Sequence, residues 1–240
     1  MQALIDFIGR ERNRFAVDDG NIFAFAFSKV TRRWAFLEII RQRHQDASAA
    51  FISNSEAFRA TIKPGGPHTM TQDQMKLQAE GWPLSNLVHL EIESFYLFAK
   101  ILLDELAHAI ENYFGPARGL SLDSHDDLAK SLRAYAAAKG LTIPEEFENS
   151  VLDLRQRISD FRDQQIAHEK SPRTMRGTTW DATGEVMLAT NRLYPKGSDK
   201  QVNSETLGGL MAALEAHIGS VISFVEANRS RARFKPAEEL

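Results

Sequence analysis

Apolar residues three or four positions apart predict four helices in the C-terminal two-thirds of the chain. The longest is expected from Asn86 to Phe114 and is ended by Gly115-Pro116, a pair that cannot continue a helix. The other three are expected over residues 124–139, 144–168 and 204–228. Gly140 and Pro172 lie just beyond the second and third of these segments. The pattern therefore predicts a mostly α protein built around a helical bundle.

The pattern changes between residues 178 and 194. Two short segments with strand-forming residues flank Asp181-Ala182-Thr183-Gly184, which is a typical turn sequence. A small β-hairpin is therefore expected as an insertion before the last helix.

The first 83 residues predict a helical extension that precedes the bundle. A helix is expected over residues 21–45 and a shorter one over residues 54–60. Pro64-Gly65-Gly66-Pro67 is the strongest break in the chain and predicts a linker or lid. The expected organisation is an N-terminal extension over 1–83, a bundle over 84–228 and a frayed polar tail over 229–240.

Composition indicates a soluble globular protein. The 240 residues are 43% hydrophobic and include 15 phenylalanines, which is enough for a packed core. The longest apolar stretch, residues 95–110, is interrupted by charged side chains, so no membrane span is expected. The first 15 residues lack the pattern of a secretory signal. The absence of cysteine excludes disulfides and thiolate metal sites, and it fits a cytoplasmic location.

The net charge of −3 argues against a protein that coats long nucleic acid, because such proteins carry broad basic faces. A local basic cluster nevertheless lies in the first 50 residues: Lys29, Arg32, Arg33, Arg41, Arg43 and His44. A solvated helix face explains this cluster, and a patch that faces RNA is the alternative. Four nearby aromatic residues are expected in the core, with an interaction surface as the alternative: Phe23, Phe25, Phe27 and Phe36.

The candidate chemistry lies late in the predicted helix 144–168, where Arg162 and Asp163 are followed by His168. Six helical positions separate Arg162 from His168 by about 9 Å of rise and about 120° of rotation, so the two side chains flank one groove. A second copy packed across a two-fold axis would bring two of each to a shared cleft. A neutral imidazole can take the proton of an RNA 2′-OH, and a guanidinium can hold the phosphate. The product would be a 2′,3′-cyclic phosphate.

The same residues also suit an ordinary helix end. A histidine there interacts favourably with the helix dipole, and an Arg-Asp pair on a helix surface is common. Arg118 and His125 have a similar spacing, but a loop and a helix start separate them. Position in a helix therefore distinguishes the two pairs.

The segment Phe161-Arg162-Asp163-Gln164-Gln165-Ile166-Ala167-His168 resembles the signature of the HEPN superfamily. That signature is an arginine, a polar residue and a histidine after four to six positions, late in a helix of a four-helix up-and-down bundle. The resemblance covers about residues 84–228. It implies catalytic roles for Arg162 and His168, with Asp163 at the polar position.

The resemblance further implies a homodimer that cleaves RNA without a metal or other cofactor, in a toxin or phage-defence setting. Any antitoxin or protein partner would be a separate chain. Since many members have the fold without activity, a non-catalytic module for dimerisation or for binding a partner or RNA is the alternative function.

Other arrangements of polar residues are weaker. Glu105 and His108 have the spacing of one half of a helical di-iron site, which needs two such pairs and two more glutamates. His89 and Glu93 lack the second histidine of a zinc-protease helix. We therefore expect no metal site and no cofactor site.

Overall fold

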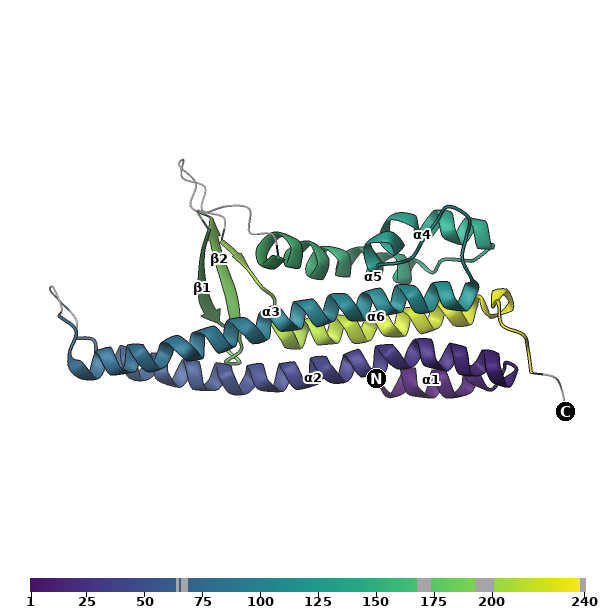
Figure 1. Ribbon diagram of the computed structural model, residues 1–240. Coiled ribbons are helices and arrows are strands. Elements are labelled where there is room, and N and C mark those ends of the chain that lie inside the picture. Colours follow the sequence, from purple (N-terminus) through teal and green to yellow (C-terminus); the bar gives the residue numbers. More distant parts are fainter. Residues whose placement is uncertain (64, 66–68, 168–173, 193–200, 238–240) are drawn as a thin grey trace. The chain divides into compact units, whose positions relative to one another are not determined.

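The computed structural model describes residues 1–63, 65, 69–167, 174–192 and 201–237. This part of the chain holds six α-helices and one small antiparallel sheet (Figure 1). The predicted class, mostly α with a hairpin insertion, is thereby confirmed. The chain forms two compact units, whose boundaries fall within α2, within α3, within the helical segment Arg162–Ala167 and within α6.

The first unit comprises Met1–Leu37, Tyr96–Asp163 and Leu210–Leu240. Parts of α2, α3 and α6 belong to the second unit. The helices that contribute to the first unit have these full bounds: α1 (Gln2–Arg12), α2 (Val17–Ala60), α3 (Gln72–Phe114), α4 (His125–Lys139), α5 (Glu145–Leu154) and α6 (Leu207–Ala227). Each presents an apolar stripe to a common core, as the three-to-four spacing predicts.

Aromatic side chains fill one end of this core. Phe23 is buried and contacts Phe7, Phe27 and Tyr113, with ring centroids 5.0–5.9 Å apart. Most of these rings meet edge to face, an arrangement that aromatic quadrupoles favour. The expectation of a core role is confirmed for Phe23 and Phe27, but it is wrong for Phe25, whose side chain is 68% exposed.

Helix α4 shows why its boundaries were readable from the sequence. The Ser124 hydroxyl accepts a hydrogen bond from the backbone N–H of Asp127, which satisfies one of the free donors of the first turn. At the other end Gly140 adopts a left-handed conformation with φ of 64°. The predicted helix over 124–139 is confirmed.

The C-terminal segment is packed, and the expectation of frayed residues from 229 onward is wrong as far as residue 237. Phe234 is buried against Phe15, with ring centroids 5.2 Å apart. The backbone of Lys235 accepts a hydrogen bond from Ala16, and that of Ala237 donates one to Arg14. The buried ring of Phe234 and these backbone hydrogen bonds together hold the segment.

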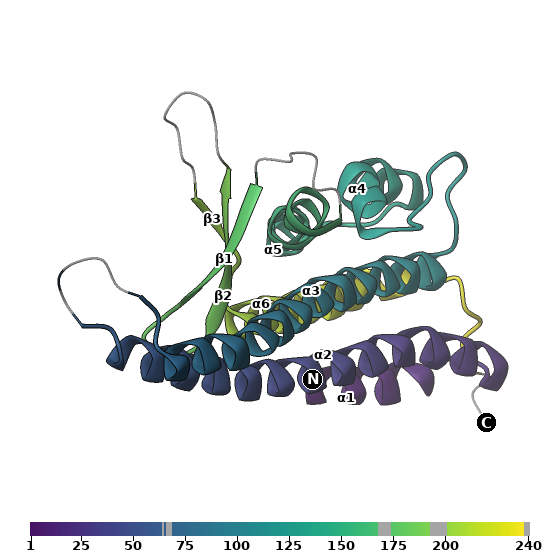
Figure 2. The same cartoon turned by 60° about the vertical axis from the view of Figure 1, so that its left-hand side comes forward.

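The second unit comprises Glu38–Phe95 and Gln164–Gly209. Within it the C-terminal part of α2 lies beside the N-terminal part of α3, and the Asn54 side chain donates to the carbonyl of Leu77. The sheet has the order β1-β2-β3, with bounds Thr174–Trp180, Val186–Arg192 and Gln201–Asn203 (Figure 2). The predicted hairpin is β1 and β2, and β3 was not foreseen.

Helix α2 contacts the sheet of this second unit through a buried histidine. His44 Nε2 lies 2.9 Å from the carbonyl oxygen of Val186, and Ser48 Oγ accepts a bond from the N–H of the same residue. Burial lowers the pKa of His44. His44 is therefore a structural residue, which removes it from the basic cluster named above.

The N-terminal helices are longer than predicted. Helix α2 is one helix of 44 residues, and α3 already begins at Gln72 and passes through Pro83. The expected division at residue 83 therefore falls inside α3, and of the Pro64–Pro67 break only Gly65 lies among the described residues.

Helix α6 is long and apolar enough to cross a membrane by length and composition alone, and 44% of its most apolar stretch is buried inside the protein.

Candidate functional site

The helix that carries Arg162 continues α5 with widened turns. After Leu154 the backbone forms π-helical turns over Arg155–Asp160 and Arg162–Ala167. The predicted helix is thus confirmed as far as Ala167, with a geometry that the spacing did not foresee. Such turns are rare and occur often at functional sites. His168 lies outside the described residues.

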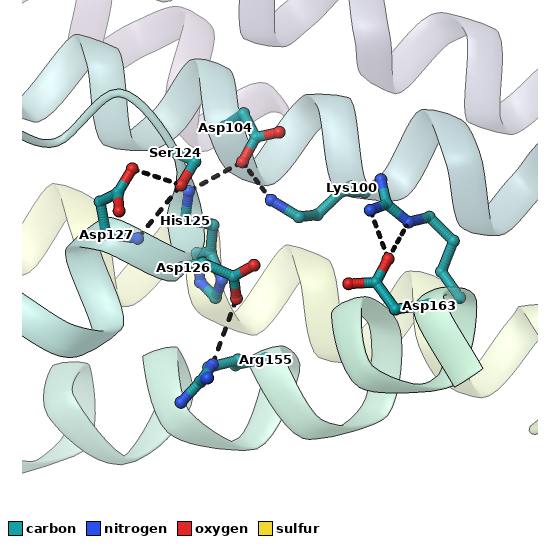
Figure 3. A network of polar contacts seen from close by, with 9 residues as sticks. Lys100, Asp104, Ser124, His125, Asp126, Asp127, Arg155 and Asp163 are labelled. Carbon is teal, nitrogen blue, oxygen red and sulfur yellow. Dashed lines mark hydrogen bonds and ion pairs between the residues drawn. The ribbon is translucent and has the colours of Figure 1, made fainter. Parts of the chain in front are cut away.

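Arg162 and Asp163 pair with each other (Figure 3). Arg162 Nε donates to Asp163 Oδ1 at 2.8 Å, and Nη2 of the same guanidinium donates to the same oxygen. The Arg162 side chain is 25% exposed and that of Asp163 is 39% exposed. The cation is therefore reachable from solvent, but one of its edges is already occupied.

The residue before Arg162 fixes this part of the helix to the first unit. The Phe161 ring stacks on the buried ring of Tyr96, with centroids 4.6 Å apart and 25° between the ring planes. An offset stack of this kind is an orienting contact. It holds the start of the Arg162 turn against α3.

A second ion pair lies on α3 in the same view (Figure 3). Lys100 is buried and donates to Asp104 Oδ1 at 2.5 Å, one helical turn away. The same carboxylate oxygen accepts the backbone N–H of His125 at 2.7 Å. Asp104 thus neutralises a buried cation and also caps the first turn of α4.

A third pair joins α4 to the widened helix. Arg155 Nε donates to Asp126 Oδ1 at 3.2 Å, and the two side chains are about one-third exposed. Figure 3 shows that Arg155, Lys100 and the Arg162–Asp163 pair lie near one another in the first unit. Each of these three cations has a carboxylate partner, so the region is balanced in charge.

Two buried histidines lie beneath this region. The rings of His125 and His217 are 5.7 Å apart and nearly perpendicular. Among the described residues, neither ring nitrogen of His125 has a hydrogen-bond partner. His217 Nδ1 lies 2.8 Å from Ser150 Oγ, and its Nε2 has no partner in the same part of the chain.

Both imidazoles are neutral at neutral pH. Burial lowers the pKa of His125 well below its usual value, and the nearby His217, Lys100 and Arg155 lower it further. Burial lowers the pKa of His217 to about 4. Because neither ring is exposed, neither can take a proton from an RNA strand.

The structure also describes the residues of the other spacings considered in the sequence. Glu105 pairs with Arg33 at 3.5 Å, which gives this glutamate a structural partner. Among the described residues no group of three or more histidine, aspartate or glutamate side chains could hold a metal ion. The predicted loop and helix start between Arg118 and His125 are confirmed, since His125 is the first residue of α4, and the structure adds that its side chain is buried.

Sequence reasoning missed Lys100, Asp104 and Arg155. The four-residue spacing of Lys100 and Asp104 on one helix face was a usable signal for an ion pair. The contact of Arg155 with Asp126 joins segments 29 positions apart and had no local signal.

Comparisons of the chain with protein-family models, with curated proteins and with solved structures found no match.

Proposed function

We propose that this protein is a HEPN-like, metal-independent endoribonuclease that acts as a homodimer. The observation that carries the proposal is the Arg162–Asp163 pair, which lies partly exposed on a widened turn of the helix that the motif predicts. A guanidinium in this position can bind a phosphate, and the charge that builds on that phosphate strengthens the contact.

Asp163 has a specific part in this proposal. Its Oδ1 accepts both Nε and Nη2 of Arg162, so it fixes the plane of the guanidinium. A fixed plane leaves the Nη1 edge in a defined direction for a bidentate contact with a phosphate. Asp163 is therefore a positioning residue.

The proposal requires a second copy of the chain. On a regular helix, six positions would separate Arg162 from His168 by about 9 Å of rise, so one copy alone would be a loose site. Two-fold packing would supply both groups from both copies. One His168 would then accept the 2′-OH proton, and the 2′ oxygen would attack the adjacent phosphorus as the P–O5′ bond breaks. The leaving 5′ oxygen would take its proton from water.

The test is cleavage of mixed-sequence RNA in excess EDTA by the wild type, Arg162→Ala and His168→Ala. We expect cleavage by the wild type and loss of at least a hundredfold in each variant, since each group acts on the transition state. Arg157→Ala is the matched control, because Arg157 lies on the same helix and pairs with Asp153 at 2.8 Å. It should retain wild-type cleavage.

Equal activity in the wild type and both motif variants would refute the proposal, as would the absence of wild-type cleavage across diverse RNAs.

The second candidate is a non-catalytic helical module that dimerises or binds a partner. The observation in its favour is that Arg162 is already paired within one chain. This function predicts that Arg162→Ala leaves partner binding intact, whereas changes to apolar interface residues abolish it.

A further inference from the structure

One face of α2 in the first unit combines aromatic and basic side chains. Counting about 100° per residue, the members of this face fall within an arc of about 100° along 15 residues. They are Ile22, Phe25, Lys29, Arg32, Arg33 and Phe36. Phe25 is 68% exposed, and Lys29 and Arg32 are also exposed. We refer to these six residues as the α2 face.

The cations of the α2 face lie over its rings. Lys29 Nζ is 5.6 Å from the centroid of the Phe25 ring, and Arg32 Cζ is 5.5 Å from that of Phe36. Arg33 Cζ is 5.9 Å from the centroid of the same Phe36 ring. Cation–π contacts of this kind hold long side chains in place without neutralising them.

Few carboxylates oppose these charges. No acidic residue occurs between positions 20 and 37 of the chain. Arg33 contacts Glu105 of α3 at 3.5 Å. Among the described residues Lys29 and Arg32 form no ion pair with a carboxylate. The α2 face therefore remains positive although the whole chain has a net charge of −3.

A hollow of about 410 Å³ adjoins Phe25. Its volume is in the range of sites that take a small planar ligand. It lies entirely within the first unit and is lined by Asn21, Ile22, Phe25, Ala26, Lys29 and Asn112. The amide oxygens of Asn21 and Asn112 accept hydrogen bonds from Arg12 and Arg233, so the amide N–H groups of both side chains remain as donors to a ligand.

We propose that the α2 face binds single-stranded nucleic acid. The exposed ring of Phe25 supplies a stacking surface for a base, and Lys29 and Arg32 contact the flanking phosphates. Phe36 holds Arg32 in place and itself packs edge to face on Phe98, with ring centroids 5.6 Å apart. As a docking surface for an RNA substrate this face rests on the function proposed above, whereas its binding of a strand can be tested alone.

The experiment is fluorescence anisotropy with a labelled single-stranded DNA 12-mer of mixed sequence, at salt concentrations from 50 to 200 mM. DNA lacks the 2′-OH that the proposed cleavage needs, so binding is measured without cleavage. We expect the wild type to bind and Phe25→Ala to weaken binding on the order of tenfold, the usual effect of losing one stacked base. Lys29→Gln combined with Arg32→Gln should reduce the slope of log affinity against log salt by about 1.4.

Lys130→Gln is the control, because Lys130 is an exposed cation on α4, outside the α2 face. It should bind as the wild type does. Phe25→Leu keeps an apolar side chain at an exposed position, so it separates loss of the ring from loss of folding, and it should also weaken binding.

Absence of binding by the wild type, or equal binding by the wild type and Phe25→Ala, would overturn the inference. Binding to anionic phospholipid vesicles in place of the 12-mer would overturn it as well. If the wild type binds the 12-mer as expected but cleaves no RNA, the inference stands and the proposed nuclease function fails.

Discussion

Acidification should destabilise the first unit through its two buried imidazoles. His125 and His217 are neutral in the folded protein, because burial lowers the pKa of both, that of His217 to about 4. In the unfolded chain a histidine has a pKa near 6.5. The unfolded state therefore binds more protons below pH 6.5, and stability falls as pH decreases.

The size of the effect follows from this difference in proton binding. Between pH 6.5 and pH 5 each imidazole that stays neutral when folded reduces the free energy of unfolding by about 1.5 kcal/mol. The pair accounts for about 3 kcal/mol, a large share of the 5–15 kcal/mol typical of a protein of this kind. Well above pH 6.5 both imidazoles are neutral in the folded and the unfolded states, so this loss of stability is absent there. Carboxylates titrate mainly below this window, so they add little to the change.

The assay is urea unfolding followed by circular dichroism at pH 6.5, 6.0, 5.5 and 5.0. His125→Leu is the informative variant, because leucine fills a buried position where neither ring nitrogen has a partner among the described residues. It should remove about half of the pair's pH dependence, or about 1.5 kcal/mol between pH 6.5 and pH 5. His44 also has a lowered pKa, so the difference between variant and wild type is the decisive quantity.

His108→Gln, at an exposed position of α3, controls for replacement of a histidine elsewhere. If the wild type and His125→Leu lose stability equally between pH 6.5 and pH 5, the reasoning is refuted.

Three further substitutions test the packing of the first unit by urea unfolding at pH 7. Tyr113→Phe should cost about 2 kcal/mol, because the Tyr113 hydroxyl donates at 2.5 Å to the buried carboxylate of Glu11, and an unchanged midpoint would contradict this. Asp104→Ala should cost about 3 kcal/mol by leaving buried Lys100 unpaired, and Lys100→Met should cost less since no buried charge remains. Gly140→Ala should cost about 1 kcal/mol at its φ of 64°, and a stabilised variant would show that the strain is absent.

The sequence was most informative where local chemistry decides the structure. Ser124 and Gly140 defined α4 because a cap and a left-handed glycine act within one turn. The turn at Asp181 likewise marked the hairpin, where the carboxylate accepts the N–H of Thr183 at 2.9 Å.

The extents of α2 and α3 could not be read in the same way. The helix was expected to start at Asn86, but α3 begins at Gln72 and passes through Pro83, which lies on an exposed side of the helix where the lost hydrogen bond is tolerated. The exposure of Phe25 beside buried Phe23 and Phe27 was equally hidden, since it depends on which neighbours cover each face of α2.

The candidate site was foreseen in part. The arginine, its acidic neighbour and their late position in a helix came from the sequence, and the Arg162–Asp163 pair lies on that helix. The spacing of Lys100 and Asp104 on one helix face was a signal for an ion pair that the prediction did not use. The widened turns and the contact of Arg155 with Asp126, 29 positions away, had no local signal in the sequence.

The most direct test of the proposed nuclease is the chemistry of its product ends. RNA incubated with the wild type in excess EDTA should yield fragments with 2′,3′-cyclic phosphate and 5′-OH ends, and Arg162→Ala should yield none. Fragments with 3′-OH ends, or cleavage that requires added Mg²⁺, would contradict the account.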